Sequence, residues 1–428
     1  MRIIAALALF MTAFAITANT HIYVQSLRIW IYAWHIFVPI IPIHLALALL
    51  MGTLFKADRA AILYYLWAGL FLLVVALSVA LSADSSGISE ANRYASTIGI
   101  GLTFVAAVQH RTLATAGALG IALATCAAAS ISFAEFFNPE YTAIVDQRYE
   151  NDAIKENVIS RVGGLHVNPN TNARIMTFGM FVSCFFLPKH LRLLLCLFVG
   201  AAVFTTVSRS GMLTWAIAMV MLTALGQFSS GKAFTKLFGF IGVGALGLLI
   251  VTGQVPKVLE ATGLEEFMTG SMLDRVSSGF ISQESSSTDV RLELVPLAIE
   301  LYSQNPIFGA GVGQSKELGD TGQGPHNAFL EVAAELGTVG LVVFLFLFLI
   351  PILLKSPKAI CFITLFAFSC MFGHGILVKA TLAFILPTGI VLLSRLDSQQ
   401  QKARQVRSQK GRRRRRRRRL PQHAAARV

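Results

Sequence analysis

The sequence predicts an all-α membrane protein with about twelve transmembrane helices. The chain of 428 residues is 55% apolar and only 14% charged, whereas soluble domains are about half apolar and a quarter charged. The apolar residues also come in blocks. Segments 61–81 and 339–354 carry no charged side chain over about the length that crosses a bilayer core. These two observations argue against an ordinary soluble domain.

Twelve apolar spans can be placed along the chain, with boundaries accurate to a few residues. They cover 3–18, 36–54, 61–81, 94–109, 113–136, 172–187, 191–207, 211–226, 234–253, 327–354, 358–376 and 379–394. Residues 1–18 have a second interpretation as a cleaved signal peptide, because they combine a basic start, an apolar stretch and small residues at the end. Cleavage would leave every later span in place.

Short basic connectors predict the orientation of these spans. They contain Lys56/Arg59, Arg111, Lys189/Arg192, Lys232/Lys236 and Lys355/Lys358. All of them fall on one side of the predicted topology, which the positive-inside rule assigns to the cytoplasm. Most acidic residues fall in the opposite loops. We therefore expect a multi-pass membrane protein with both termini in the cytoplasm.

The basic character of the chain is confined to its C-terminal tail. Residues 395–428 carry 14 of the 36 Lys/Arg side chains and one of the 22 acids, which leaves the first 394 residues almost neutral. The run from Arg412 to Arg419 predicts a disordered tail, because its like charges repel. Anionic lipids of the cytoplasmic leaflet are the expected partner, and no nucleic-acid partner is expected.

Two loops on the outer side are long, 137–171 and 254–326. Loops of this size are uncommon unless they are functional or disordered. In the second, Leu292, Val295, Ile299 and Tyr302 recur at helical spacing. We expect an interfacial helix that is capped by Thr288 or Asp289 and ends before Pro306. The chain thus divides into a polytopic membrane domain, 1–394, and the tail, 395–428.

Arginines are concentrated in the outer loops and at the outer ends of the spans. They are Arg148, Arg161, Arg209, Arg275 and Arg291. Arginine presents a planar fork of donors that matches phosphate oxygens and stays charged at any relevant pH. An alternative for each arginine is an ion pair with a loop acid or a lipid headgroup. Five on one face nevertheless favour an anionic substrate.

His326 is the strongest candidate for a catalytic residue. It lies at the outer start of the span 327–354, after the glycine-rich segment 309–313, which we interpret as a tight turn. The intrinsic pKa of histidine near neutrality suits it to accept a proton from a hydroxyl group. Glu331 and Glu335 follow inside an otherwise apolar helix, where charged groups are costly and usually face a polar interior. Either could support His326, while helix capping and interhelical hydrogen bonding are the structural alternatives.

The cysteines give no indication of a metal site or a structural disulfide. All five lie inside apolar spans rather than in the outer loops, where an oxidising environment could pair them. There is no CxxC motif and no Cys/His spacing typical of zinc ligands. We therefore expect neither a metal nor another cofactor.

Four segments resemble the superfamily of O-antigen ligases and Wzy-type polymerases. They are RVGGLHVNPN at 161–170, SRSG at 208–211, VRLELVPLAIELYSQNPIFGAGVG at 290–313 and HNAFLEVAAELGTVG at 326–340. The resemblance covers most of the chain. Its last two motifs, in that order, are fairly specific for the superfamily but do not separate its members.

The resemblance implies a metal-independent, inverting glycosyltransferase with a GT-C-like architecture and a periplasmic active site. Such an enzyme moves a polysaccharide from undecaprenyl pyrophosphate to a hydroxyl group, which in ligases belongs to a sugar of the lipid A core. By their motifs, His326 would be the general base, and Arg161 and Arg291 would bind the pyrophosphate. Arg209 matches the family turn. Arg148 and Arg275 are adjacent basic positions without an aligned motif.

Three other functions remain open. A polymerase of the same superfamily would use the same chemistry with a second glycan as acceptor. A non-enzymatic transporter would also be polytopic, but would be expected to carry broken or polar helices near the middle of the bilayer. A scaffold of the envelope-assembly machinery would tolerate the loss of His326.

Overall fold

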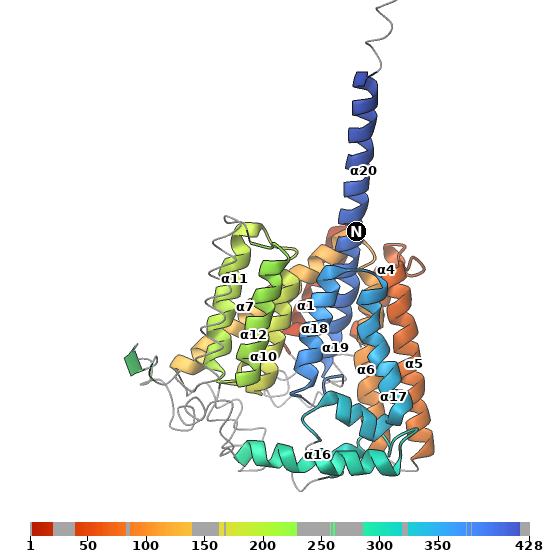
Figure 1. The fold of residues 1–428 in the computed structure, drawn as a ribbon, viewed down its shortest axis with the longest axis vertical. Helices are drawn as coiled ribbons and strands as arrows, with labels where there is room; N and C mark the ends of the chain where they lie inside the picture. Colours follow the sequence, from red (N-terminus) through yellow and green to blue (C-terminus); the bar gives the residue numbers. More distant parts are fainter. Residues whose placement is uncertain are drawn as a thin grey trace, which may run out of the picture.

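The chain folds into a bundle of helices with one helix laid across its end (Figure 1). This computed structural model describes residues 2–19, 39–82, 86–138, 162–166, 168–228, 257, 260–261, 286–318, 324–373, 375–377 and 379–419, with the side chains of 86, 286–292, 380, 383, 404, 407 and 410–419 left out. The described helices are α1 (Arg2–Thr17), α4 (Ile40–Leu50), α5 (Arg59–Leu81), α6 (Ser86–Ala107), α7 (Arg111–Phe137), η2 (Gly164–His166), α10 (Pro169–Ser183), α11 (Lys189–Thr205), α12 (Arg209–Ala224), α16 (Ser286–Gln304), η4 (Gln314–Glu317), α17 (Ala328–Leu353), α18 (Pro357–Cys370), α19 (Ala380–Pro387), η5 (Thr388–Leu392) and α20 (Leu393–Arg419).

The prediction of an all-helical protein is confirmed for the described residues, which contain no strand. Three of their helices are long and apolar enough to cross a bilayer, namely α5, α7 and α17. The apolar helices α1, α4, α12 and α18 are shorter, with 10–17 residues. The predicted span 234–253 lies outside the described residues. The total of twelve spans and the GT-C-like architecture therefore remain predictions.

Aromatic side chains pack the helices together. Phe178 of α10 lies 5.7 Å from Phe362 and 6.0 Å from Phe366, both of α18, measured between ring centroids. Phe344 of α17 is likewise fully buried. Aromatic rings bury large areas and favour tilted or edge-to-face pairs at these distances. Van der Waals packing of this kind is a main source of association between helices in lipid.

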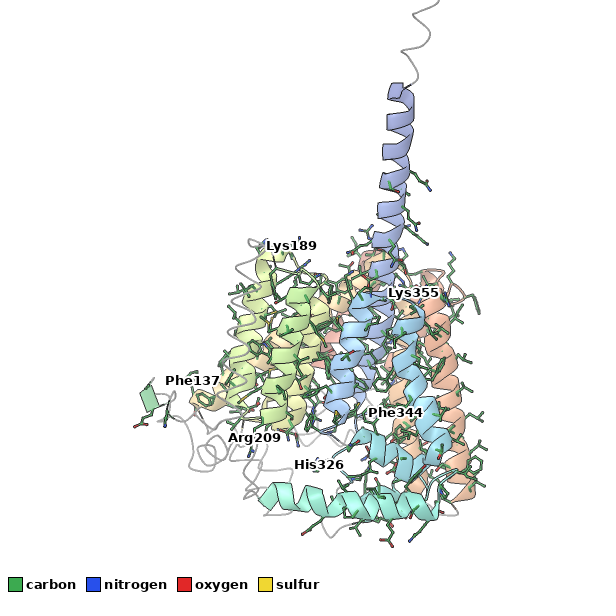
Figure 2. All side chains as sticks on the ribbon, in the orientation of Figure 1. Phe137, Lys189, Arg209, His326, Phe344 and Lys355 are labelled. Carbon is green, nitrogen blue, oxygen red and sulfur yellow. The ribbon has the colours of Figure 1, made fainter. Side chains whose placement is uncertain are left out.

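The predicted basic connectors that the structure describes share one end of the bundle, as Lys189 and Lys355 show in Figure 2. The connector with Lys232 and Lys236 lies outside the described residues. Arg395, at the start of α20, joins two of these connectors. Its Nε donates to Asp58 Oδ2 at 2.7 Å, and its Nη2 donates to Gln109 Oε1 at 2.5 Å. The tail and the connectors after α4 and α6 therefore meet at this end. We call it the basic end, and the opposite end the α16 end.

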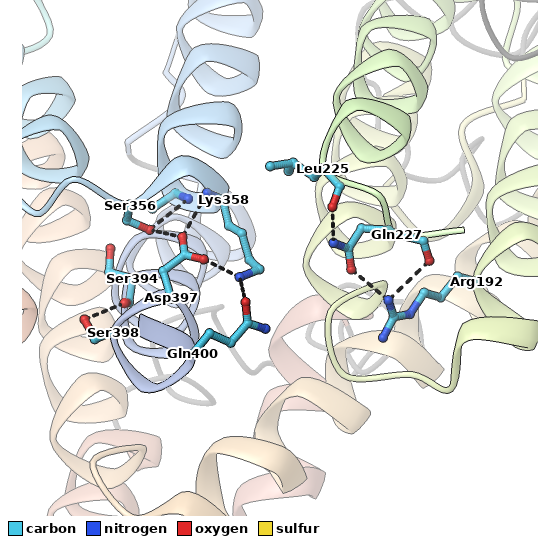
Figure 3. A network of polar contacts seen from close by, with 10 residues as sticks. Arg192, Leu225, Gln227, Ser356, Lys358, Ser394, Asp397, Ser398 and Gln400 are labelled. Carbon is cyan, nitrogen blue, oxygen red and sulfur yellow. Dashed lines mark hydrogen bonds and ion pairs between the residues drawn. The ribbon is translucent and has the colours of Figure 1, made fainter. Parts of the chain in front are cut away.

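A buried network fixes the base of α20 at the basic end (Figure 3). The Asp397 carboxylate accepts hydrogen bonds from Ser356 Oγ at 2.6 Å and from the backbone N–H of Lys358 at 3.0 Å. It also pairs with Lys358 Nζ, which donates to Gln400 Oε1 at 3.0 Å. Ser356 caps α18 in turn. These contacts attach α20 rigidly to α18.

The tail differs from the prediction of disorder from residue 395. The structure describes α20 as one helix from Leu393 to Arg419, which projects away from the bundle (Figure 1). Arg, Gln, Lys and Ala all favour helices, and α20 continues a helix whose first turns are already fixed by packing. Extending an existing helix avoids the cost of nucleation. Charge repulsion between the arginines was therefore not sufficient to predict disorder.

The predicted helix of the second outer loop is present as α16, and it crosses the end of the bundle (Figure 1). It begins at Ser286, before the predicted caps, and ends at Gln304 as expected. The face of α16 that packs on the bundle is not the predicted apolar face, which stays exposed as expected of an interfacial helix. Leu294 and Ala298 pack inward, while Val295 and Ile299 are 36% and 52% exposed. In a helix lying at a membrane surface, an outward apolar stripe faces lipid rather than protein.

Candidate functional site

His326 and Arg209 both lie at the α16 end of the bundle (Figure 2). His326 is partly buried and comes just before α17. Asn327 caps this helix, because its side-chain oxygen accepts hydrogen bonds from the backbone N–H groups of Phe329 (3.0 Å) and Leu330 (3.2 Å). Such a cap fixes the residue at which a helix begins. The cap therefore fixes the position of His326, which directly precedes it in the chain.

Arg209 is the first residue of α12, not part of a four-residue turn as predicted. The turn ends at Ser208, whose hydroxyl oxygen accepts from the Gly211 N–H (3.2 Å) and donates to Asn170 Oδ1 (2.7 Å). Val207, just before it, has a φ of 50°, which is strained for a β-branched residue. Strain of this kind persists only where surrounding contacts hold the backbone in place. Here the hydrogen bonds of Ser208 to the starts of α10 and α12 supply those contacts.

The side chains of the other four predicted arginines are not among those that the structure describes. Arg291 belongs to α16, but its side chain is not described. Arg148, Arg161 and Arg275 lie outside the described residues. The prediction that five arginines share one substrate therefore stays a prediction.

Glu331 and Glu335 are buried at the start of α17, only 3% and 2% exposed. The Glu331 carboxylate accepts a hydrogen bond from the Gly375 N–H at 2.7 Å. Ser315 Oγ donates to Glu335 Oε1 at 2.6 Å. The two carboxylates thus connect α17 to the loop between α18 and α19 and to η4. This is a tertiary role that the spacing of the two residues along the sequence does not show.

The helix α17 is interrupted at Gly337, which has φ 65° and ψ −165°. The interruption leaves carbonyl and N–H groups without intrahelical partners, and segment 306–311 supplies the partners. Backbone N–H groups of Ala310 and Gly311 donate to the carbonyls of Ala334 (2.9 Å) and Glu335 (3.1 Å). In return, the N–H groups after the break, from Thr338 and Val339, donate to the carbonyls of Pro306 (2.8 Å) and Ile307 (3.2 Å).

We call the contact between segment 306–311 and the break in α17 the interlock. Its backbones approach so closely that glycine is required at two positions. A Cβ atom on Gly309 would lie 2.3 Å from the Glu335 backbone, and one on Gly337 would lie 2.3 Å from the Ile307 backbone. Gly309, Gly311 and Gly313 all have positive φ angles, so the glycine-rich segment forms the predicted tight turn. The turn docks directly into the break of α17, next to Glu335.

An ion pair that the sequence did not single out lies beside this turn. Lys316 Nζ contacts Glu90 Oε1, and Arg93 Nη1 donates to Glu90 Oε2 at 3.0 Å. Glu90 and Arg93 belong to the first turns of α6, which begins eight residues before the predicted span 94–109. Hydropathy missed these turns because they are polar. The charge of Glu90 in these turns is compensated by Arg93 of the same helix and by Lys316 of η4.

Two further basic residues meet at the α16 end, Arg174 of α10 and Lys379 at the start of α19. Arg174 is only 3% exposed, and its Nη2 donates to the carbonyl of Phe372. Lys379 Nζ donates to Thr171 Oγ1 at 3.1 Å. A sequence signal for both residues existed. Each lies inside or at the edge of a predicted span, and charged groups at membrane depth usually mark functional sites.

The helix directions add to the positive potential at this end. The chain alternates between the two ends, so that α6, α10, α12, α17 and α19 all begin at the α16 end (Figure 1). Each helix N-terminus carries roughly half a positive charge. Asn168, Ser208 and Asn327 cap three of them through side-chain oxygens. Backbone dipoles and basic side chains together make this end suited to anions.

The site combines a histidine, several buried or half-buried cations and two carboxylates at one end of a helix bundle. Such a set can bind a phosphorylated group and move a proton at a nearby hydroxyl. Among the residues that the structure describes, no group of three His, Cys, Asp or Glu side chains could hold a metal ion.

Comparison with known proteins finds a family match over part of this site. Residues 194–345 match the family described as O-antigen ligase. The matched region runs from α11 to the apolar half of α17. It includes Arg209, Arg291, His326 and both glutamates, whereas Arg174 and Lys379 lie outside it. None of the curated proteins compared with the chain matches it.

Proposed function

We propose that the chain, which matches the O-antigen ligase family over residues 194–345, is an O-antigen ligase of the superfamily of O-antigen ligases and Wzy-type polymerases. In this proposal it transfers a polysaccharide from undecaprenyl pyrophosphate to a sugar hydroxyl of the lipid A core. The transfer takes place at the periplasmic face of the inner membrane. One observation carries the proposal: His326 and Arg209 lie at the end of the bundle where five of the described helices begin.

The donor's pyrophosphate is the group that the cations suit. Arg209 is the first residue of α12, so its charge adds to that of the helix N-terminus. Arg161, Arg291, Arg275 and Arg148 are proposed to contribute from the loops and from α16. Pyrophosphate gains negative charge as it leaves the sugar, and fixed donors stabilise that charge most in the transition state.

His326 is proposed to act as the general base. A sugar hydroxyl is a poor nucleophile near neutral pH, so a base must accept its proton as the oxygen attacks the anomeric carbon. The new glycosidic bond forms as the bond to the pyrophosphate oxygen breaks, which inverts the anomeric configuration. Glu331 and Glu335 support the start of α17 through Gly375 and Ser315. No cofactor is needed in this scheme.

A transporter is the less favoured alternative, because the break in α17 lies near an end of the bundle. Ser78 Oγ donates to the carbonyl of Glu335 at 3.4 Å, and Ser78 is three residues from the end of α5. A transporter would be expected to interrupt its helices near the bilayer midplane. A polymerase remains the alternative within the superfamily, since the same groups would serve a second glycan as acceptor.

Complementation of a strain that lacks its O-antigen ligase tests the function. We expect this chain to restore glycan-capped lipid A core, visible as a ladder on gels of lipopolysaccharide. Purified protein should then transfer glycan from the polyprenyl donor to isolated core. The chain with His326→Ala serves as the inactive control. An altered chain-length distribution without capping would favour the polymerase, and no effect on either product would contradict both.

Labelling of two exposed serines tests the proposed orientation. Ser303 lies on α16, and Ser408 lies on α20, at opposite ends of the protein. We expect Ser303→Cys to react with an impermeant thiol reagent added to spheroplasts, and Ser408→Cys to react only after the membrane is opened. The reverse pattern would put the proposed site in the cytoplasm, where a periplasmic transfer could not occur.

A further inference from the structure

We propose that Asn170 is a positioning residue, which holds Arg209 in place through a hydrogen bond to Ser208. The proposal rests on the proposed function, in which Arg209 binds the pyrophosphate of the donor. It joins two segments that the sequence presents separately, RVGGLHVNPN at 161–170 and SRSG at 208–211. Arg209 lies inside the matched family region, and Asn170 lies outside it.

The backbone at Asn170 is fixed by the start of α10. Asn168 caps this helix, because its side-chain oxygen accepts hydrogen bonds from the backbone N–H groups of Asn170 (3.0 Å) and Thr171 (3.1 Å). Pro169 is the first residue of the helix, where its fixed φ angle suits the helix and its missing N–H costs nothing. The side chain of Asn170 therefore extends from a well-defined position.

Ser208 connects the start of α12 to this position. Its hydroxyl oxygen accepts from the Gly211 N–H of its own helix (3.2 Å) and donates to Asn170 Oδ1 of α10 (2.7 Å). Ser208 is fully buried, so a hydroxyl that loses a partner there cannot replace it with bulk water. Arg209 follows as the first residue of α12. The bond thus ties the residue before Arg209 to a second helix.

The turn that leads into α12 needs this support. Val207 has a φ of 50°, which a β-branched residue adopts only where surrounding contacts impose it. After the turn, α12 approaches α10 so closely that a Cβ atom on Gly211 would lie 2.4 Å from Ala173 Cβ. If the bond to Asn170 were lost, relaxation of Val207 toward a negative φ would shift the first turn of α12, and Arg209 with it.

Binding of farnesyl pyrophosphate, a short polyprenyl pyrophosphate, to the purified protein in nanodiscs tests this role. Asn170→Ala is expected to raise the Kd about 3- to 10-fold, the range that corresponds to one neutral hydrogen bond. Ser208→Ala removes the donor of the same bond. It should raise the Kd at least as much, because the cap of α12 is lost as well. A Kd within twofold of wild type for either variant would overturn the proposal.

The matched control is Gln227→Ala. Gln227 Oε1 accepts a hydrogen bond from Arg192 Nη1 at the same distance of 2.7 Å, but at the basic end of the bundle, where α12 ends (Figure 3). Its loss should lower the thermal denaturation midpoint and leave the Kd unchanged. An equal rise in the Kd of the control would overturn the proposal, because affinity would then follow stability alone.

A double-mutant cycle with Arg209→Ala tests whether Asn170 acts through Arg209. Loss of a charged donor is expected to raise the Kd about 10- to 100-fold. In the Arg209→Ala background, Asn170→Ala should add less than a further twofold, because the side chain that it positions is already gone. Factors that multiply would show that Asn170 acts independently of Arg209, and would overturn the positioning role.

Failure of the proposed function gives a different result. The binding measurement needs no acceptor, so a non-additive loss of affinity supports the role of Asn170 even if the chain fails to cap lipid A core. Wild-type transfer and an unchanged Kd for Asn170→Ala would leave the ligase function standing and remove Asn170 from the site.

Discussion

Replacement of His326 by alanine is expected to slow glycan transfer by about 10²–10⁴-fold, the range typical of a lost general base. The acceptor hydroxyl would then have to attack without a group to take its proton. Donor affinity should change little, because the cations remain. The experiment is in vitro transfer by the purified variant in nanodiscs containing EDTA, together with the Kd for farnesyl pyrophosphate. Wild-type protein should be unaffected by EDTA.

A matched control for this variant is His190→Ala. His190 is exposed at the start of α11, at the basic end, so its loss should leave transfer unchanged. Transfer by His326→Ala at the wild-type rate would remove His326 from the chemistry. A raised Kd with unchanged turnover would instead make it a donor-binding residue.

Replacement of Gly337 by alanine is expected to destabilise the protein and abolish transfer. The φ and ψ angles of Gly337 fall in a region that is essentially restricted to glycine, and strain there costs about 1–3 kcal/mol. A Cβ atom would also meet the Ile307 backbone at 2.3 Å. Overpacking of this kind costs a further 1–3 kcal/mol, roughly. The measurement is the thermal denaturation midpoint in detergent, followed by transfer activity.

Gly69→Ala is the control for Gly337→Ala. Gly69 lies inside α5 with no other atom within 4 Å of an added Cβ, so alanine should be neutral or stabilise the helix by about 0.5–1 kcal/mol. Gly309→Ala should behave like Gly337→Ala, because it clashes with the Glu335 backbone from the opposite side of the interlock. A Gly337→Ala protein as stable as wild type would show that segment 306–311 can leave the break without cost.

The ends of the helices show where sequence reasoning lost accuracy. The spans 61–81 and 113–136 agree with α5 and α7 to within two residues, because long apolar runs leave little choice. The spans 172–187 and 211–226 begin two or three residues after α10 and α12. Their polar first turns are helical because Asn168 and Ser208 cap them. Hydropathy detects the apolar part of a helix, whereas capping decides its first residue.

The candidate site was predicted in part. Its motifs pointed to His326 and Arg209, which lie at the same end of the bundle. They did not point to Arg174, which the sequence presents as one charge inside an apolar span. Its partner Phe372 is 198 residues away. No local pattern can show that α10 and the loop after α18 meet, since that contact depends on the packing of the whole bundle.

The sequence by itself determined the membrane class, the separation of basic connectors from the outer loops, and the position of His326 at the start of α17. Each of these follows from local composition, which fixes what a segment can bury and where a helix can begin. Only the tertiary structure decided that segment 306–311 completes the hydrogen bonds of a broken helix, and that the loop between α18 and α19 contacts the start of α10. The physical reason is that unpaired backbone groups and buried polar side chains are unfavourable in isolation. They become stable only when distant parts of the chain supply their partners.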